Sequence, residues 1–212
     1  MSHHSNSKPL GRPRTKEKPM PTDELILQKA ASLFLESGFQ QVSIDHVASE
    51  ANVTKATIYY YFESKSELYK EAIVSLMRRI KEQVERLMSS NKPLYERLYD
   101  VTEAHLRSTT PHNLDSFSRE VKKMLSHEQI DYMKQVEEQI YEGIELGLLE
   151  AVEAGEIPEI NVKFATKAYL SLVRVGNIEL SEDSQIFTSL NDAVDSILNV
   201  FWRGFFGDQI KS

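Results

Sequence analysis

The stretch VTKATIYYYF, residues 53–62, places hydrogen-bond donors beside aromatic rings in a chain whose formal net charge is -7. Lys55 can donate to guanine, and Thr57 can hydrogen-bond a base edge. Ala56 is small enough for close approach to a thymine methyl group. Tyrosine is rigid and ends in a hydroxyl that can reach a phosphate oxygen or a base. These residue types together indicate a nucleic-acid contact.

A short helix over 54–61, capped by Thr54, is predicted to position these side chains. Ile58 and Phe62 lie four residues apart, so they face the same way and can anchor the helix to its own domain. The tyrosines at 59–61 fan out by about 100° per residue, so they cannot all be core. The alternative is an aromatic-rich core helix, in which the tyrosine rings would be packed away from solvent.

The elements on either side support the first interpretation. Ser43 is a suitable N-cap for a short preceding helix, and Asn52 tolerates the left-handed backbone of a tight turn. A short helix, a tight turn and a second short helix form a helix-turn-helix arrangement. Ser64 begins the next helix in the S-x-x-E form of a capping box. Lys65, just inside that helix, is placed where an ammonium and a helix N-terminus can engage one phosphate.

The pattern is helical almost throughout, with no alternating strand pattern, and predicts an all-α protein. A first helix is expected over 23–37, with Thr22 or Asp23 as its cap and Gly38 as its stop. After the helix-turn-helix, further helices are expected over 64–89, 93–109, 114–125, 127–154, 161–176 and 184–205.

Charge is distributed unevenly along the chain. Residues 1–70 have a formal charge of +1, whereas residues 71–212 have a charge of -8. The first residues are rich in proline and carry Lys8, Arg12, Arg14, Lys16 and Lys18 against Glu17 alone. The expected organisation is a flexible basic arm over 1–22, a helix-turn-helix domain over 23–69 and a C-terminal domain over 70–212. The alternative for the arm is a disordered, solubilising tail.

Residues 25–69 resemble the DNA-binding domain of the TetR/AcrR family of one-component transcriptional regulators. The motifs that carry the resemblance are Ala31-x-x-Leu-Phe34, Glu36-x-Gly38-Phe39, Val42-Ser43-Ile44, Val47-Ala48, Val53-x-Lys55-Ala56-Thr57-Ile58-Tyr59, Tyr61-Phe62 and Ser64-Lys65-x-Glu67-Leu68. Two positions depart from the family pattern. Asn52 stands where glycine is usual, at a modest backbone strain, and Tyr61 stands where histidine is frequent.

The resemblance implies that three helices bind double-stranded DNA while a larger helical body binds a small effector and forms a homodimer. It assigns phosphate or base contacts to Ser43, Thr54, Lys55, Thr57, Tyr59, Tyr60, Tyr61 and Lys65, beside which Ala56 allows close approach. Gly11-Arg12-Pro13-Arg14 resembles a short arm that enters an A·T-rich minor groove, which makes Arg12 and Arg14 candidate contacts.

The C-terminal half gives weaker signals. The last helices carry an apolar surface wider than one packing seam needs, which favours a homodimer over a monomer core strip. The candidate dimer residues are Phe164, Ala168, Leu172, Phe187, Leu190, Val194, Ile197, Phe201 and Trp202. An effector cavity is expected between the middle helices. Its candidate residues are Tyr95, Tyr99, His105, Phe117, Met124, Tyr132, Tyr141, Tyr169, Arg174 and Asn177. Gly143 and Gly147 form a G-x-x-x-G that favours close helix packing.

Several function classes lack support in the sequence. There is no cysteine, which excludes disulfides and thiolate chemistry. No G-x-S-x-G, P-loop, H-E-x-x-H or Glu-x-x-His motif occurs, so an enzyme, a metal centre or a cofactor is not predicted. No apolar run of about 18 residues predicts a membrane span, and a cytoplasmic location is expected. The remaining rival is a helical DNA-binding or chromosome-organising protein that does not switch; for a regulator, repression is favoured over activation.

Overall fold

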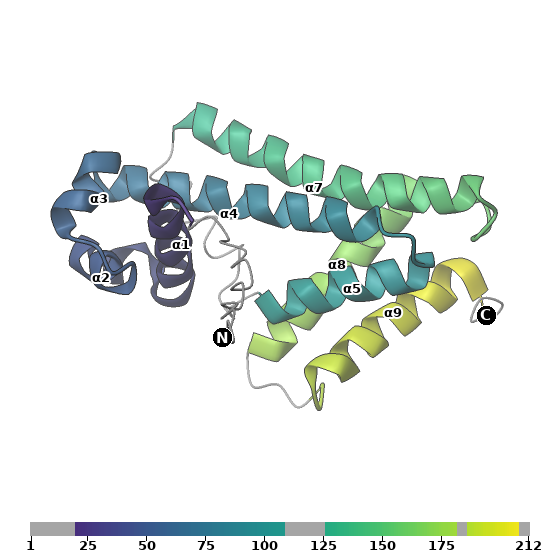
Figure 1. Cartoon of the computed structure of the whole chain (residues 1–212). Coiled ribbons are helices and arrows are strands. Elements are labelled where there is room, and N and C mark those ends of the chain that lie inside the picture. Colours follow the sequence, from purple (N-terminus) through teal and green to yellow (C-terminus); the bar gives the residue numbers. More distant parts are fainter. Residues whose placement is uncertain (1–19, 109–125, 182–185, 208–212) are drawn as a thin grey trace, which may run out of the picture.

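The computed structural model describes residues 20–108, 126–181 and 186–207, and in these ranges its regular elements are helices (Figure 1). The predicted all-α fold is confirmed for this part of the chain. The predicted helix over 114–125 lies outside the described residues. The helices are α1 (Thr22–Gln41), α2 (Ile44–Glu50), α3 (Lys55–Tyr61), α4 (Lys65–Met88), α5 (Leu94–Ser108), α7 (His127–Glu153), α8 (Val162–Ser181) and α9 (Leu190–Phe206).

Helix α1 begins where the sequence predicts, but not for the predicted reason. Its N-cap residue is Pro21, and no side chain bonds to the first turn, so the expected capping by Thr22 or Asp23 is wrong. Gly38 interrupts the helical backbone with φ of +77°, as predicted for a stop. A residue with a Cβ would be strained in that left-handed conformation.

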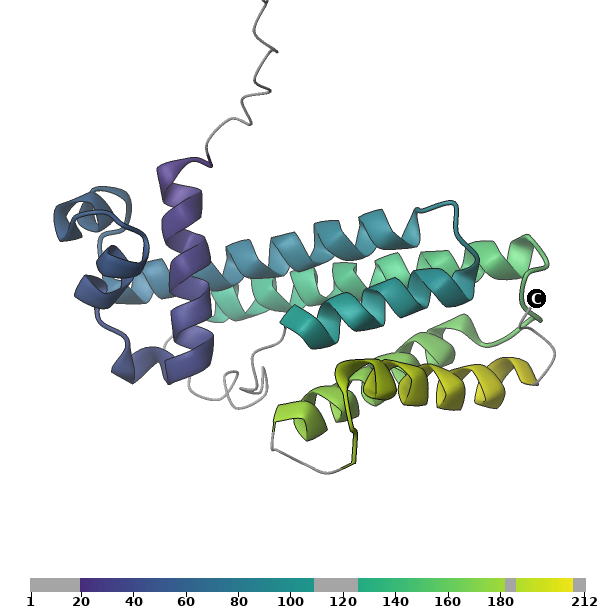
Figure 2. The same cartoon turned by 60° about the horizontal axis from the view of Figure 1, so that its bottom comes forward.

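The buried side chains form two clusters that share α4. The first cluster joins α1, α2 and α3 to the front of α4, where Tyr69 packs edge-on against Phe34 with ring centroids 4.8 Å apart. The second cluster joins the rear of α4 to α5, α7, α8 and α9. Helix α4 therefore runs from the N-terminal unit (α1 to α3, residues 22–61) into the C-terminal body (residues 65–207) (Figures 1 and 2).

The G-x-x-x-G of α7 packs closely on α4, as predicted. A Cβ built on Gly143 would lie 3.5 Å from Val84 Cγ1, and one built on Gly147 would overlap the end of Met88. Glycine at both positions lets the two long helices run side by side (Figures 1 and 2). The rear half of α4 is thereby held by α7 over much of its length.

A buried arginine fixes the end of α4 to the connection between α7 and α8. Arg97 on α5 donates from Nη1 to the Met88 carbonyl oxygen at 2.9 Å and from Nη2 to Glu156 Oε2 at 3.4 Å. The other oxygen of Glu156 accepts from the Leu94 backbone N–H. A nearly buried charge is tolerable here because a carboxylate and a carbonyl both satisfy it.

Two predicted boundaries in the body are wrong. Helix α8 continues through Gly176 to Ser181, because this glycine is a packing position: a Cβ there would lie 2.5 Å from Ile197 Cδ1. Helix α9 begins at Leu190, since Ser189 Oγ accepts from the Asp192 N–H at 3.1 Å and caps the helix there. None of the helices in the described ranges is long and apolar enough to cross a membrane.

Candidate nucleic-acid interface

Helix α3 points its tyrosines outward and its aliphatic stripe inward. Tyr59, Tyr60 and Tyr61 are 49%, 81% and 41% exposed, whereas Ile58 and Phe62 are 0% and 7% exposed. This arrangement rejects the alternative of an aromatic core helix. Tyr60 and Tyr61 meet edge-on with ring centroids 5.0 Å apart, so their hydroxyls lie on a small, ordered aromatic surface.

The start of α3 is organised by two threonine hydroxyls. Thr54 Oγ1 accepts from the Thr57 N–H at 3.1 Å, which confirms the predicted cap. The two hydroxyl oxygens also lie 2.8 Å apart and share a hydrogen bond. Because that bond uses one of their two hydrogens, the other hydrogen can be donated to an external acceptor.

Lys55 is exposed beside these hydroxyls and forms an ion pair with α2. Its Nζ lies 2.7 Å from Asp45 Oδ2, and the side chains are 51% and 67% exposed. The hydrogen bond from Asp45, followed by its charge, raises the pKa of Lys55, so the ammonium stays protonated. Sequence reasoning missed Asp45, because a partner ten residues away in another helix leaves no local signal.

The turn before α3 has the predicted backbone. Asn52 has φ of +52°, the left-handed conformation, and is the described non-glycine residue with positive φ. The Val53 N–H then donates to the Ala48 carbonyl oxygen at 2.9 Å, which closes the turn against α2. This turn sets the angle at which α3 leaves α2.

Ser43 and Lys65 flank α3 at two other helix starts. Ser43 Oγ accepts from the His46 N–H at 3.1 Å and caps α2, as predicted. Lys65 Nζ donates to the Gln40 carbonyl oxygen at 3.3 Å and lies 4.4 Å from the centre of the Phe39 ring. Burial lowers the pKa of Lys65. An ammonium has three hydrogens, so these contacts still leave Lys65 a donor for a phosphate.

The predicted DNA contacts in the described residues therefore share one exposed end of the molecule, formed by α2, α3 and the start of α4 (Figure 1). Ala56 is exposed between Lys55 and Thr57. Arg12 and Arg14 lie outside the described residues.

The predicted effector residues do not converge on one site. Tyr132 and Arg174 are exposed, on α7 and α8 respectively. Tyr95 is half-buried with its ring edge-on to Trp202, with centroids 5.1 Å apart, and burial raises the pKa of its hydroxyl. The half-buried Tyr99 and Tyr141 lie on α5 and α7, and Phe117 and Met124 lie outside the described residues.

Two pairs among these candidates do meet between α5 and α8. Asn177 Nδ2 lies 2.7 Å from His105 Nε2, and burial lowers the pKa of this imidazole. Tyr169 is buried, and its hydroxyl lies 2.8 Å from Thr102 Oγ1. Burial raises the pKa of Tyr169, so this phenol stays neutral. Both pairs put polar groups inside the body.

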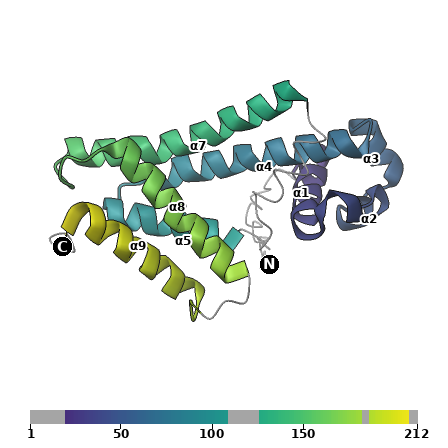
Figure 3. The ribbon, with the colours of Figure 1, turned by 180° about the vertical axis from the view of Figure 1, so that it is seen from behind.

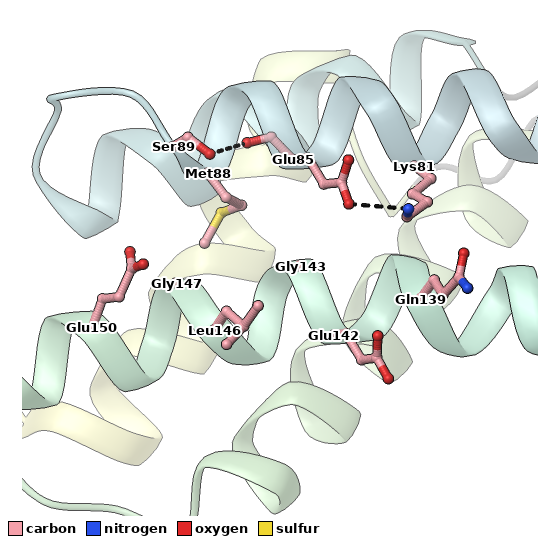
Figure 4. Close-up of a pocket in the computed structure, with 10 residues that line it drawn as sticks. All are labelled: Lys81, Glu85, Met88, Ser89, Gln139, Glu142, Gly143, Leu146, Gly147 and Glu150. Carbon is pink, nitrogen blue, oxygen red and sulfur yellow. Dashed lines mark hydrogen bonds and ion pairs between the residues drawn. The ribbon is translucent and has the colours of Figure 1, made fainter.

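A groove of about 280 Å³ lies elsewhere, between α4 and α7 (Figure 4). Its lining includes Met88 and Leu146, with Lys81, Glu85 and Glu142 at the rim (Figure 4). Lys81 Nζ and Glu85 Oε1 pair at 3.3 Å. None of its residues was predicted as an effector contact, although the glycines at 143 and 147, which form part of its wall, were visible in the sequence.

The predicted dimer residues divide into buried and accessible sets. Val194, Ile197, Phe201 and Trp202 are at most 4% exposed and belong to the core of the same protomer, so their assignment to a dimer surface is wrong. The reason is that α5 and α8 already cover this stripe of α9. Phe164 is 63% exposed. Ala168, Leu172, Phe187 and Leu190 are half-buried.

Comparison with known proteins connects this geometry to a family. Residues 26–72 match the family model described as "Bacterial regulatory proteins, tetR family". The HTH-type transcriptional regulator YhgD of Bacillus subtilis is 28% identical over 159 residues, which cover 71% of this chain and 81% of YhgD. The negative transcriptional regulator IcaR of the biofilm operon in Staphylococcus aureus is 25% identical over 137 residues, covering 52% of this chain and 73% of IcaR.

The fold is shared over most of the chain. The crystal structure of the transcriptional regulator FadR from Bacillus subtilis in complex with stearoyl-CoA aligns with a TM-score of 0.66 at 21% identity, covering 85% of this chain and 98% of FadR. The matched segment holds α2, α3 and the front of α4, which carry the exposed donors described above. The chain belongs to the TetR family of bacterial regulatory proteins and is a helix-turn-helix transcriptional regulator.

Proposed function

We propose that this regulator binds a palindromic operator as a homodimer, represses transcription there, and is released by a small-molecule effector. The observation that carries the proposal is the outward display of Lys55 and three tyrosines from a helix whose Ile58 and Phe62 are buried. An exposed aromatic and cationic surface on a short, capped helix suits a DNA groove, where hydroxyls and ammonium groups meet phosphates and base edges.

Each residue at this surface has a proposed role. Lys55, Ala56 and Thr57 lie at the start of α3 and contact base edges. The tyrosines at 59–61 reach the phosphates on either side of the groove. Ser43 and Lys65 hold phosphates at the starts of α2 and α4. Arg12 and Arg14 are proposed to enter the minor groove beside the site.

The proposed division into domains follows the same roles. The basic arm over 1–22 and the domain over 23–69 bind DNA, and the domain over 70–212 binds the effector and dimerises. The first core cluster continues along α4 as far as Met77, so the two domains share this helix. A shared helix gives the effector domain a rigid connection to the DNA contacts.

The dimer surface is proposed on the outer faces of α8 and α9 (Figure 3). Phe164, Val175 and Val200 are 63%, 51% and 61% exposed. Ala168 and Leu172 lie between Phe164 and Val175 along α8 and are half-buried. Exposed apolar side chains grouped on two packed helices are typical of a protein interface. Two-fold symmetry would then place two copies of α3 on one face of the DNA.

Replacing Phe164 by aspartate is expected to convert the dimer to a monomer, because a carboxylate would be buried without a partner in the paired state. Sedimentation velocity measures the mass, and operator affinity should fall with it because one α3 is lost. The control is Leu146→Asp, since Leu146 is 57% exposed but lies on α7. A Phe164→Asp variant that stays dimeric would place the interface elsewhere.

The effector is proposed to act by moving α4. Its binding groups are sought at the His105–Asn177 and Tyr169–Thr102 pairs and in the α4–α7 groove, all of which lie in the body. Because Arg97 fixes the rear end of α4, a ligand that displaces the middle of this helix would swing its front end. The spacing of the two α3 helices in the dimer would change, and simultaneous docking would be lost.

Selection of bound sequences from random DNA tests the proposed function. A single short palindrome with half-sites about one helical turn apart is expected. Broad coverage without a motif would instead favour the chromosome-organising alternative. Release by metabolites and drugs is then measured on the selected duplex, and long-chain acyl-CoA is included because the similar FadR of Bacillus subtilis was crystallised with stearoyl-CoA.

A further inference from the structure

The surface that is proposed to contact DNA is not basic. Residues 43–63 carry Lys55 against Asp45, Glu50 and Glu63, which is a formal charge of -2. Non-specific affinity for DNA comes almost entirely from Lys and Arg side chains that replace the counterions of phosphates. Helices α2 and α3 can therefore supply little of it, and the ion pair between Asp45 and Lys55 reduces it further.

The ion pair is built from two helix starts. Asp45 lies in the first turn of α2, and Lys55 is the first residue of α3. The partial positive charge of a helix N-terminus favours Asp45 but disfavours an ammonium. No acidic residue in the first turn of α3 compensates for Lys55. Asp45, with its carboxylate 2.7 Å from Lys55 Nζ, supplies that compensation from the neighbouring helix.

The pair can be exchanged for another acceptor. Both side chains are more than half exposed, and exposed ion pairs are weak because water screens them. Lys55 can therefore leave Asp45 for an acceptor on DNA. The exchange is favourable only when the new acceptor offers more than the carboxylate does, because Asp45 is then left unpaired near a polyanion.

We propose that Asp45 is a specificity-determining residue that acts through Lys55. The inference rests on the proposed contact between α3 and DNA. On a random duplex, Lys55 would exchange one oxygen anion for another and gain little. On the operator, a guanine in register presents its O6 and N7 acceptors together, which a single phosphate contact does not match. Asp45 therefore lowers affinity for random DNA more than affinity for the operator.

The test compares wild type with Asp45→Asn, which keeps the shape of the side chain and removes its charge. Affinity for the selected operator and for a scrambled duplex is measured by fluorescence anisotropy across a salt series. Asp45→Asn is expected to bind the scrambled duplex about three- to tenfold more tightly, with a salt slope steeper by about 0.9 for each Lys55 that engages a phosphate. The ratio of operator affinity to scrambled affinity should fall, and Asp45→Glu should restore it.

Two controls separate this mechanism from simple loss of negative charge. Glu50→Gln removes the same charge from the same helix, and Asp45→Asn in a Lys55→Ala background removes the charge without its partner. Neither should change the affinity ratio. An equal change in either control would overturn the proposal, as would an unchanged ratio in Asp45→Asn.

The outcome is distinguishable from failure of the proposed DNA contact. If Lys55→Ala and Tyr60→Ala bind the operator like wild type, α3 does not contact DNA and the proposed function is wrong at this surface. If both weaken operator binding while Asp45→Asn leaves the ratio unchanged, only the role of Asp45 is wrong. Circular dichroism of each variant checks that α2 and α3 remain folded.

Discussion

Replacing Tyr60 by alanine is expected to weaken operator binding by at least about tenfold while leaving the fold intact. Tyr60 is 81% exposed, and its ring leans edge-on against Tyr61. A hydrogen bond to a charged group contributes about 1.5–3 kcal/mol, and each 1.4 kcal/mol is about a factor of ten in affinity. In a dimer the contact is lost twice, which enlarges the effect.

The measurement is anisotropy on the selected operator, together with thermal denaturation. Substitution of an exposed residue usually changes stability by about 0.5 kcal/mol or less, so the melting temperature should hardly move. Tyr132→Ala is the matched control, because Tyr132 is also an exposed tyrosine, at 45%, but on α7. Tyr60→Phe separates the hydroxyl from the ring. Operator affinity equal to wild type in Tyr60→Ala would refute the assignment.

Replacing Phe34 by alanine is expected to remove about 3–5 kcal/mol of stability, because a large buried ring leaves a cavity behind. Phe34 is 0% exposed and packs on Phe39 and Tyr69, with centroids 5.9 Å and 4.8 Å away. The loss is a large share of the roughly 5–15 kcal/mol that stabilises a typical protein. Operator binding should fall as well, since this cluster holds α2 and α3 against α4.

Chemical denaturation followed by circular dichroism measures this loss. Phe34→Leu is the graded control, because it keeps most of the volume and should cost much less. The second core cluster does not include Phe34, so the body should unfold later than the N-terminal unit in the alanine variant. A variant that melts like wild type in a single step would show that Phe34 does not hold the unit together.

The sequence predicted the N-terminal unit well because its signals are local. Ser43 and Thr54 each cap a helix through a backbone N–H three residues ahead, so residue type and spacing suffice to find them. Asn52 marks the turn by its tolerance of positive φ. The spacing of Ile58 and Phe62 fixes the inward face of α3, and the outward tyrosines follow from it.

The body was predicted less well because its contacts are not local. Gly176 resembles a helix stop, yet it is a packing site against Ile197. An apolar stripe on α9 looks the same in the sequence whether its own protomer or a partner covers it. Trp202 and Phe201 were therefore assigned to a dimer surface, although α5 and α8 bury them in the same chain.

By itself the sequence determined the helical class, the helix starts and the outward face of α3, since each depends on residues within about one helical turn. Only the tertiary structure decided which distant side chains meet. Arg97 and Glu156 are 59 residues apart, and Lys55 and Asp45 lie on different helices. Helical periodicity states which face a side chain occupies, but the packing of one helix on another decides what that face contacts.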